Sequence, residues 1–142
     1  AIGADATAAR ASTLALSQIG DSRAQNLMEL KLSSGALIDR RAALTYFAKL
    51  PEKGIEVAKR LASNTIEREA RMGIELMGLI GTENSLTTVA TYLKDPRRGV
   101  VIQALLSLDR RCPAASRPIM MELRQAVDPL IKAVAQRVDV GR

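Results

Sequence analysis

The chain has 142 residues, the size of one ordinary domain, and carries a net charge of +6, with 47% hydrophobic but only 2% aromatic residues. A core with so few aromatic side chains must be built from aliphatic residues, methionine and alanine, which suits close-packed helices better than a sheet. Histidine is absent, which removes the commonest acid–base group at neutral pH and the commonest metal ligand. We therefore expect a single all-α domain over residues 1–142.

In the first half of the chain, apolar residues recur at spacings of three and four, which is typical of amphipathic helices. Gly20 and the segment 33–35 interrupt the pattern, and Pro51 ends one helix while suiting the first turn of the next. The first helix is rich in alanine and has only a thin apolar stripe, as expected of an end cap. The four helices predicted here cover residues 5–19, 22–32, 36–50 and 51–61.

The segment from Thr65 to Asp95 holds two further helices joined by a tight turn. Gly81 is expected to end the first of them, because glycine adopts the left-handed conformation without steric cost, and Thr82 to cap the second. Neither helix can bury its apolar face alone, so both need neighbours. The apolar faces consist of Ala70, Ile74, Met77 and Ile80 in the first helix and Leu86, Val89, Ala90 and Leu93 in the second.

Three more helices are predicted after residue 95. In Asp95–Pro96 and in Asp128–Pro129 the carboxylate can cap free amides, and the proline suits the first helical position. The helix from Asp95–Pro96 to about Arg111 is apolar around most of its circumference, which predicts neighbours on several sides. A short helix follows over about 118–126. The last helix, with Gly141 as its stop, carries a stripe of Leu130, Ile131, Val134 and Val138.

These helices follow an internal repeat with a period near 31 residues. Arg10, Arg41 and Arg71 occupy equivalent places, 31 and 30 residues apart, and Leu105 follows Ile74 by 31. The repeating unit is a helical hairpin. Because an arginine at a fixed repeat position can bridge neighbouring repeats, the three arginines are better explained by hydrogen bonds between repeats than by a row of anion contacts.

The segments DRRAALTYFAKL, EREARMGIELMGLIG and DPRRGVVIQALLSL resemble HEAT-like repeats of the short type. The sequence MGLIG at 77–81 follows the helix ending of that family, and Arg41 and Arg71 fall on its arginine, whereas Ile102 stands there in the fourth repeat. The resemblance covers about residues 8–126. It implies an α-solenoid of about four hairpins plus a C-terminal helix. Members of the family usually act as protein-binding scaffolds, and a minority act on DNA, modify proteins with metals or handle bilins.

No common catalytic or phosphate-binding pattern is present. The sequence lacks a GxxxxGK[ST] or GxGxxG loop, and without histidine a nucleophilic triad lacks its usual base. The carboxylate pairs Glu52 with Glu56 and Glu67 with Glu69 are better explained as solvated helix faces, and Cys112 as a buried, inert thiol. Uncharged runs reach only ten residues, about half of a membrane span. We therefore expect no enzyme, cofactor, metal site or membrane span.

Positive charge is concentrated near the C-terminus, since residues 97–142 hold 9 basic and 4 acidic side chains. Arg97 and Arg98 open a predicted helix, where cations are mildly disfavoured, and Arg110 and Arg111 close it, where the helix dipole favours them. A local cost without a visible compensating partner is a hint of binding, with solubility as the alternative. The candidate partner-binding residues, expected on one face, are Arg97, Arg98, Arg110, Arg111, Arg117 and Arg124.

Two functions fit these patterns. The first is a non-enzymatic scaffold or adaptor that docks another protein, whose surface could be acidic, in its groove or at its basic C-terminal end. The second is a module that binds the backbone of a nucleic-acid duplex. The net charge of +6 supports the second function, whereas three aromatic residues and no tryptophan argue against stacking on single strands.

Overall fold

The structure, a computed structural model, describes residues 22–141. These residues form eight α-helices and two short 3₁₀ helices, with no strand among them. The predicted all-α class is therefore confirmed, while the helix predicted over 5–19 lies outside the described residues. The chain divides between Leu50 and Pro51 into two compact units. The single domain over 1–142 stays a prediction.

The described part of the first unit contains two helices, α2 (Ser22–Leu32) and α3 (Leu37–Ala48), which pack against each other. Polar side chains hold the turn between them. The hydroxyl oxygen of Ser34 accepts a hydrogen bond from the N–H of Ala36, and the same hydroxyl donates to the carboxylate of Asp39. Both helices agree with the predicted ranges to within two residues, because this turn stops one helix and starts the next.

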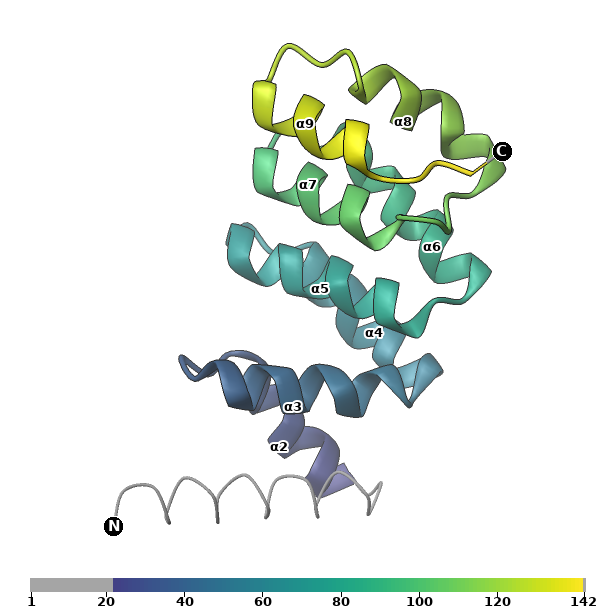
Figure 1. Ribbon diagram of the computed structural model, residues 1–142. Helices are drawn as coiled ribbons and strands as arrows, with labels where there is room; N and C mark the ends of the chain where they lie inside the picture. The colour runs from purple at the N-terminus through teal and green to yellow at the C-terminus, as the bar shows by residue number, and fades with distance from the viewer. Residues whose placement is uncertain (1–21, 142) are drawn as a thin grey trace. The chain divides into compact units, whose positions relative to one another are not determined.

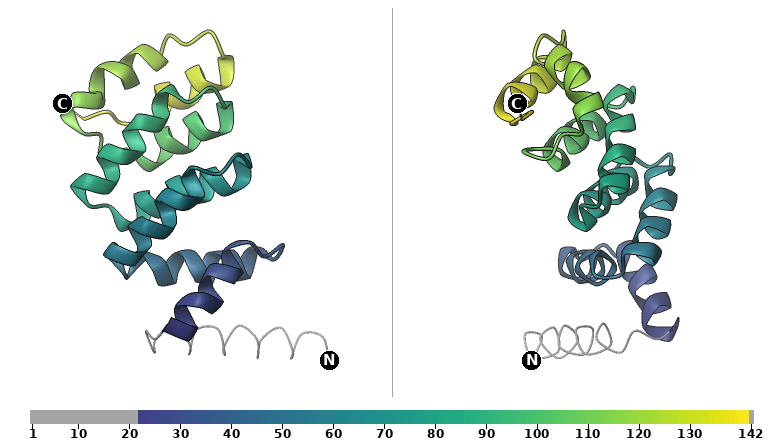
Figure 2. Two further views of the ribbon diagram at one scale, coloured as in Figure 1. Left: turned by 180° about the vertical axis from the view of Figure 1, so that it is seen from behind. Right: turned by 90° about the vertical axis from the view of Figure 1, so that its right-hand side faces the viewer.

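The second unit arranges its helices in two layers. Its helices are α4 (Pro51–Ala62), α5 (Glu67–Ile80), α6 (Glu83–Thr91), η1 (Tyr92–Lys94), α7 (Arg98–Ser107), η2 (Ala114–Ser116), α8 (Arg117–Leu123) and α9 (Pro129–Arg137). Figures 1 and 2 show α5, α7 and α9 in one layer and α4, α6 and α8 in the other. In the first of these layers, α7 packs between α5 and α9.

Two glycines let the backbone of α5 approach its neighbours closely. A Cβ on Gly73 would lie 2.4 Å from the carbonyl oxygen of Ala58 and 2.5 Å from the backbone nitrogen of Ala62, both in α4. On the other side of the helix, a Cβ on Gly78 would lie 2.9 Å from the Cβ of Ser107 in α7. Glycine inside a helix costs conformational entropy, so here it is the close packing of α5 that requires it.

The link between α5 and α6 has the predicted geometry. Gly81 adopts the left-handed conformation with φ of 68°, and its N–H donates to the carbonyl oxygen of Met77. Thr82 caps α6, since its side-chain oxygen accepts a hydrogen bond from the N–H of Ser85. Ser85 is buried, and its hydroxyl donates to the carbonyl oxygen of Met77 at 3.0 Å. This bond fixes the start of α6 to the end of α5.

Helix α7 begins later than the sequence predicts. Asp95 does not cap the helix; it ends the 3₁₀ helix η1, and its carboxylate accepts a hydrogen bond from the N–H of Arg97. The helix consequently starts at Arg98, with Arg97 as its N-cap residue in extended conformation. The prediction that Pro96 occupies the first helical position is therefore wrong.

Helix α7 also ends earlier than predicted, at Ser107 rather than near Arg111. Arg110 has a positive φ of 64°, which breaks the helix, and its N–H donates to the carbonyl oxygen of Asp139. Asp139 belongs to the segment that follows α9, and this segment buries Val138 beside the loop. The backbone hydrogen bond to the segment after α9 keeps residues 108–111 out of the helix. The local sequence does not reveal this bond, because its acceptor is distant in the chain.

The last two helices follow the sequence more closely. Asp128 caps α9 as predicted, and its Oδ1 accepts hydrogen bonds from the N–H groups of Leu130 and Ile131. Helix α8 begins at Arg117 and ends at Leu123, three residues before the predicted end. Gly141 has a positive φ, but α9 has already ended at Arg137.

A turn of one form recurs at the start of successive hairpins. The side-chain oxygens of Ser34, Asn64 and Asp95 each accept a hydrogen bond from the N–H two residues further on. These three residues are 30 and 31 apart in the sequence. In each case the acceptor of the turn stands just before a helix, so the turn sets where the helix begins.

Candidate partner-binding groove

A groove of about 600 Å³ opens on the layer that α5, α7 and α9 form. Helix α7 supplies most of its lining, at positions four residues apart that share one face of the helix. Apolar atoms dominate the lining, while charged side chains stand beside the starts of α5 and α7. The side chains that line the groove include Glu67, Arg71, Arg98, Ile102, Leu106 and Leu130.

Three large leucines lie exposed on this layer, one on each of its helices. Leu79 is 54% exposed on α5, Leu106 is 54% exposed on α7 and Leu130 is 49% exposed on α9. Leu106 and Leu130 line the same groove, whereas Leu79 is not among its lining residues. Exposed apolar side chains that gather at one place are typical of interaction surfaces, whereas isolated ones are not.

One of these leucines contradicts the sequence prediction. Leu130 was expected in the apolar stripe of the last helix together with Val138, but Leu130 is 49% exposed whereas Val138 is buried. Helix α7 has the neighbours on several sides that its apolar circumference predicts, because it packs against α5, α6, η1 and α9. Leu106 and Leu130 nevertheless stay exposed, and both line the groove.

The start of α7 has no acidic residue of its own. Its first turn contains no Asp or Glu, and its N-cap Arg97 offers no side-chain cap. A neighbouring helix, α5, supplies the negative charge through the carboxylate of Glu67, which lies next to Gly99. A Cβ on Gly99 would lie 3.1 Å from the Cδ of Glu67. A carboxylate near a helix start is stabilising, so Glu67 compensates the dipole of α7.

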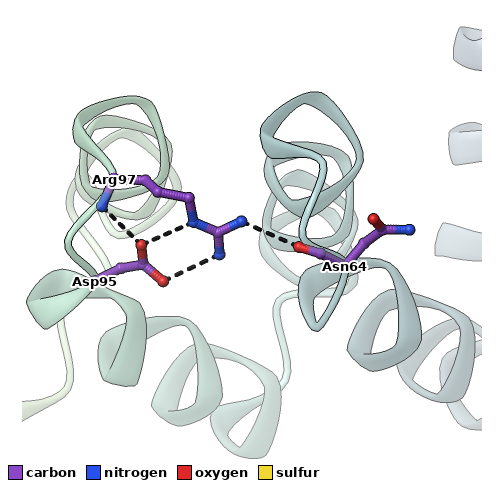
Figure 3. Close-up of polar contacts among 3 residues, drawn as sticks. All are labelled: Asn64, Asp95 and Arg97. Atoms are coloured by element: carbon purple, nitrogen blue, oxygen red, sulfur yellow. Dashed lines mark hydrogen bonds and ion pairs between the residues drawn. The ribbon is translucent and has the colours of Figure 1, made fainter.

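Arg97 joins two turns of the second unit (Figure 3). Its guanidinium makes a two-pronged ion pair with Asp95, with Nε 3.0 Å from Oδ1 and Nη2 3.1 Å from Oδ2. Nη1 donates to the carbonyl oxygen of Asn64 at 3.0 Å. The hydrogen bonds from Arg97 lower the pKa of the Asp95 carboxyl, and the pKa of the Arg97 guanidinium is raised in turn. Arg97 is thus bonded within the chain.

Arg98 also has an ion-pair partner within the chain, but more than half of its side chain remains exposed. Its Nε donates to Oδ2 of Asp128 at 2.7 Å, which joins the start of α7 to the start of α9. The hydrogen bond from Arg98 lowers the pKa of Asp128. The Arg98 side chain is 59% exposed and lines the groove. The absence of compensating partners that was inferred from the sequence for Arg97 and Arg98 is wrong.

Arg111 and Arg124 bind backbone carbonyls at helix ends. Arg111 donates from Nη2 to the carbonyl oxygen of Ser107 at the end of α7. Arg124 donates to the carbonyl oxygens of Ala135 and Val138 at the end of α9. Cations at these positions complement the negative end of the helix dipole.

Arg110 and Arg117 complete the predicted set. Arg110 is exposed, and its side chain makes no hydrogen bond or ion pair with any described residue. Arg117 is half-buried; its Nε is buried and has no hydrogen-bond partner in the part of the chain that the structure describes. Its Nη2 would lie 3.5 Å from a Cβ on Gly141.

The six predicted arginines differ in their surroundings in the described structure. Arg98 stands at the start of α7 and Arg110 beyond its end. Of the six, only Arg98 lines the groove. Their role in binding a partner stays a prediction.

The arginine ladder of Arg10, Arg41 and Arg71 stays a prediction. Arg10 lies outside the described residues, and Arg71 lines the groove. The bond from one hairpin turn to the next that the sequence led us to expect is made by Arg97 to Asn64.

Comparisons with known proteins leave the chain without a family assignment. A scan against models of protein families finds no match, and a search of curated proteins finds none either. Within residues 22–141, no group of three or more potential ligands from histidine, cysteine, aspartate and glutamate could hold a metal ion. No helix among the described residues is long and apolar enough to span a membrane.

Proposed function

We propose that this chain is a non-enzymatic scaffold of the short HEAT-like type, an α-solenoid that docks another protein in the groove of α5, α7 and α9. The observation that carries the proposal is the groove itself, about 600 Å³ in volume and lined mainly by apolar side chains. Grooves between helices are common places for apolar recognition.

The repeat character of the chain is supported by three features. Turns of one form recur 30 and 31 residues apart at Ser34, Asn64 and Asp95. The helices of the second unit alternate between two layers (Figure 1). Arg97 bonds one turn to the preceding one, as expected where each repeat contacts mainly its neighbours.

The groove is a better candidate than the basic C-terminal end. Arg97, Arg111 and Arg124 use their guanidinium groups on internal acceptors. A guanidinium that is already bonded gains less from an external anion, because the internal bonds must be exchanged. Binding of a nucleic-acid duplex, which requires several free cations along one path, therefore remains the second candidate, favoured only by the net charge of +6.

The proposal is tested by capturing partners from the native source on immobilised protein. We compare the wild type with Leu106→Glu and Leu130→Glu, which place charges in the groove. Val127→Glu is the matched control, because Val127 is fully exposed and does not line the groove.

We expect a protein that the wild type and the control retain and that both groove variants lose. Capture of the same proteins by all four chains would show that the groove is not the site. A duplex probe whose binding falls steeply with salt and is unaffected by the groove variants would favour the second candidate.

A further inference from the structure

We infer that the groove takes a short acidic segment of the partner protein, with apolar side chains on the groove floor and a carboxylate at its mouth beside Arg71 and Arg98. This inference rests on the proposed function. It names the chemistry of the partner, which neither the fold nor the repeat pattern specifies.

The floor of the groove selects for apolar side chains. Ile102 and Leu106 stand one turn apart on α7, and Leu130 faces the same groove from α9. About half of the surface of Leu106 and of Leu130 is exposed, so a ligand can still remove apolar area from water. Each aliphatic side chain that is fully buried contributes about 1.5–3 kcal/mol, which makes apolar anchors the main source of affinity.

The mouth of the groove has more hydrogen-bond donors than acceptors. Arg71 is exposed, and its side chain makes no hydrogen bond or ion pair within residues 22–141. Arg98 uses only its Nε on Asp128, so its terminal N–H groups have no partner among the described residues. The one acidic lining residue, Glu67, is turned toward Gly99 and the start of α7.

An incoming carboxylate would satisfy these donors. Arginine presents a planar fork that matches a carboxylate with two parallel hydrogen bonds. Arg71 and Arg98 come from adjacent helices and line the same groove, so one acidic side chain next to an apolar anchor fits both features. A nucleic-acid backbone fits less well, because its closely spaced phosphates would meet the apolar floor formed by Ile102, Leu106 and Leu130.

The probe is a library of random 12-residue peptides displayed on phage and selected on the wild-type chain. Enriched peptides are then synthesised, and their affinity is measured by fluorescence anisotropy for the wild type, Leu106→Glu and Arg71→Glu. Lys132→Glu is the matched control, because it changes the net charge by the same amount. Lys132 is exposed, its side chain makes no hydrogen bond or ion pair within the described residues, and it does not line the groove. Melting curves confirm that every variant is folded.

We expect enriched peptides to combine leucine, isoleucine or phenylalanine with aspartate or glutamate. Arg71→Glu should weaken their binding by about tenfold or more, because it replaces an attraction by a repulsion at close range. Lys132→Glu should change it by less than about threefold, since a distant exposed charge is screened by salt.

Three outcomes would overturn the inference: no enrichment, enrichment of basic or uncharged peptides, or equal weakening by Arg71→Glu and Lys132→Glu. A duplex of DNA that competes with the peptides for the groove would also overturn it. If capture from the native source still depends on Leu106 and Leu130 in any of these cases, the proposed function stands and only the acidic partner is wrong. If capture does not depend on them, the proposed function itself fails.

Discussion

Helix α7 has two faces that look alike in the sequence and differ in the structure. One face carries Val101 and Leu105, which are 3% and 0% exposed. The other carries Ile102 and Leu106, and Leu106 is 54% exposed. All four are aliphatic, so hydrophobicity alone does not separate the core from the groove. What separates the two faces is the packing of α7 against α5, α6, η1 and α9, which buries Val101 and Leu105 and leaves the face of Ile102 and Leu106 open to the groove.

Arginine side chains that look alike in the sequence also differ in the structure. Arg97 and Arg71 are both arginines near a helix start. The side chain of Arg97 is bonded to Asp95 and Asn64, whereas the side chain of Arg71 makes no hydrogen bond or ion pair within the described residues. A run of positive charge therefore does not mark a binding site by itself. A hydrogen-bond donor without a partner, next to exposed apolar surface, is a better indication of a binding site.

The sharpest test of the two faces compares adjacent leucines. Leu105→Asp places an unpaired charge in the core and should lower the free energy of unfolding by roughly 4 kcal/mol or more. This loss is enough to unfold a domain of marginal stability. Leu106→Asp should lower the free energy of unfolding by less than about 1 kcal/mol, as at most exposed positions. Urea unfolding followed by circular dichroism measures both, and equal losses would show that α7 has no open face.

A smaller loss of stability is expected from a substitution at the contact between α5 and α4. Gly73→Ala would place a methyl group 2.4 Å from the carbonyl oxygen of Ala58, and overpacking costs about 1–3 kcal/mol. Better helix propensity offsets about 1 kcal/mol of this, which leaves a net loss of about 0–2 kcal/mol. We expect the upper end, because the obstructing atoms belong to the backbone and cannot rotate away.

Gly35→Ala is the matched control for Gly73→Ala. A Cβ on Gly35 would meet no atom within 4 Å, so the unfolding free energy should change little. Equal stability of the two variants would show that α4 and α5 are not in backbone contact.

Much of the helix arrangement could be predicted from the sequence because it depends on local chemistry. Gly81 needs only its own conformational freedom, and Thr82 and Asp128 need only the N–H groups that follow them. The ends of α7 could not be predicted, because Asp139, which pairs with Arg110, is 29 residues away. Side-chain bonding at the start of α7 likewise brings in Asn64 and Asp128 from other hairpins.

The groove could be predicted only in general terms. An α-solenoid implies that some groove exists, but the sequence does not say which leucines line it. The signal in the sequence is the surplus of apolar residues on α7, which predicts neighbours on several sides but does not say which side stays open. An apolar circumference thus fits either an inner helix or a helix with one binding face.

The ion pair at the start of α7 should make stability depend on pH. Because the bonds from Arg97 lower the pKa of folded Asp95, the pair stabilises the fold above about pH 4, near the pKa of an unperturbed aspartate. That contribution is lost as the pH falls through the lower pKa of the folded state. Asp95→Asn should therefore lower the melting temperature at pH 7 by less than Gly73→Ala does, and its difference from the wild type should shrink below pH 3.

Glu122→Gln is the control for this pH profile, because Glu122 is exposed and its side chain makes no hydrogen bond or ion pair among the described residues. It should follow the wild type across the acid range. A difference between Asp95→Asn and the wild type that is the same at pH 7 and pH 2.5 would show that the charge of Asp95 does not stabilise the fold.

The smallest effect is expected at Cys112, which belongs to neither face of α7. Its thiol is half-buried and donates to the carbonyl oxygen of Pro113 at 3.3 Å, a bond that a serine hydroxyl can also make. Burial raises the pKa of the thiol and outweighs the opposing charge of Arg117, so the neutral and poorly nucleophilic form prevails at pH 7. Cys112→Ser should change the unfolding free energy by no more than about 0.5 kcal/mol and leave peptide binding unchanged. A folded Cys112→Ser chain that no longer retains the captured partner would give the thiol a role that the groove does not explain.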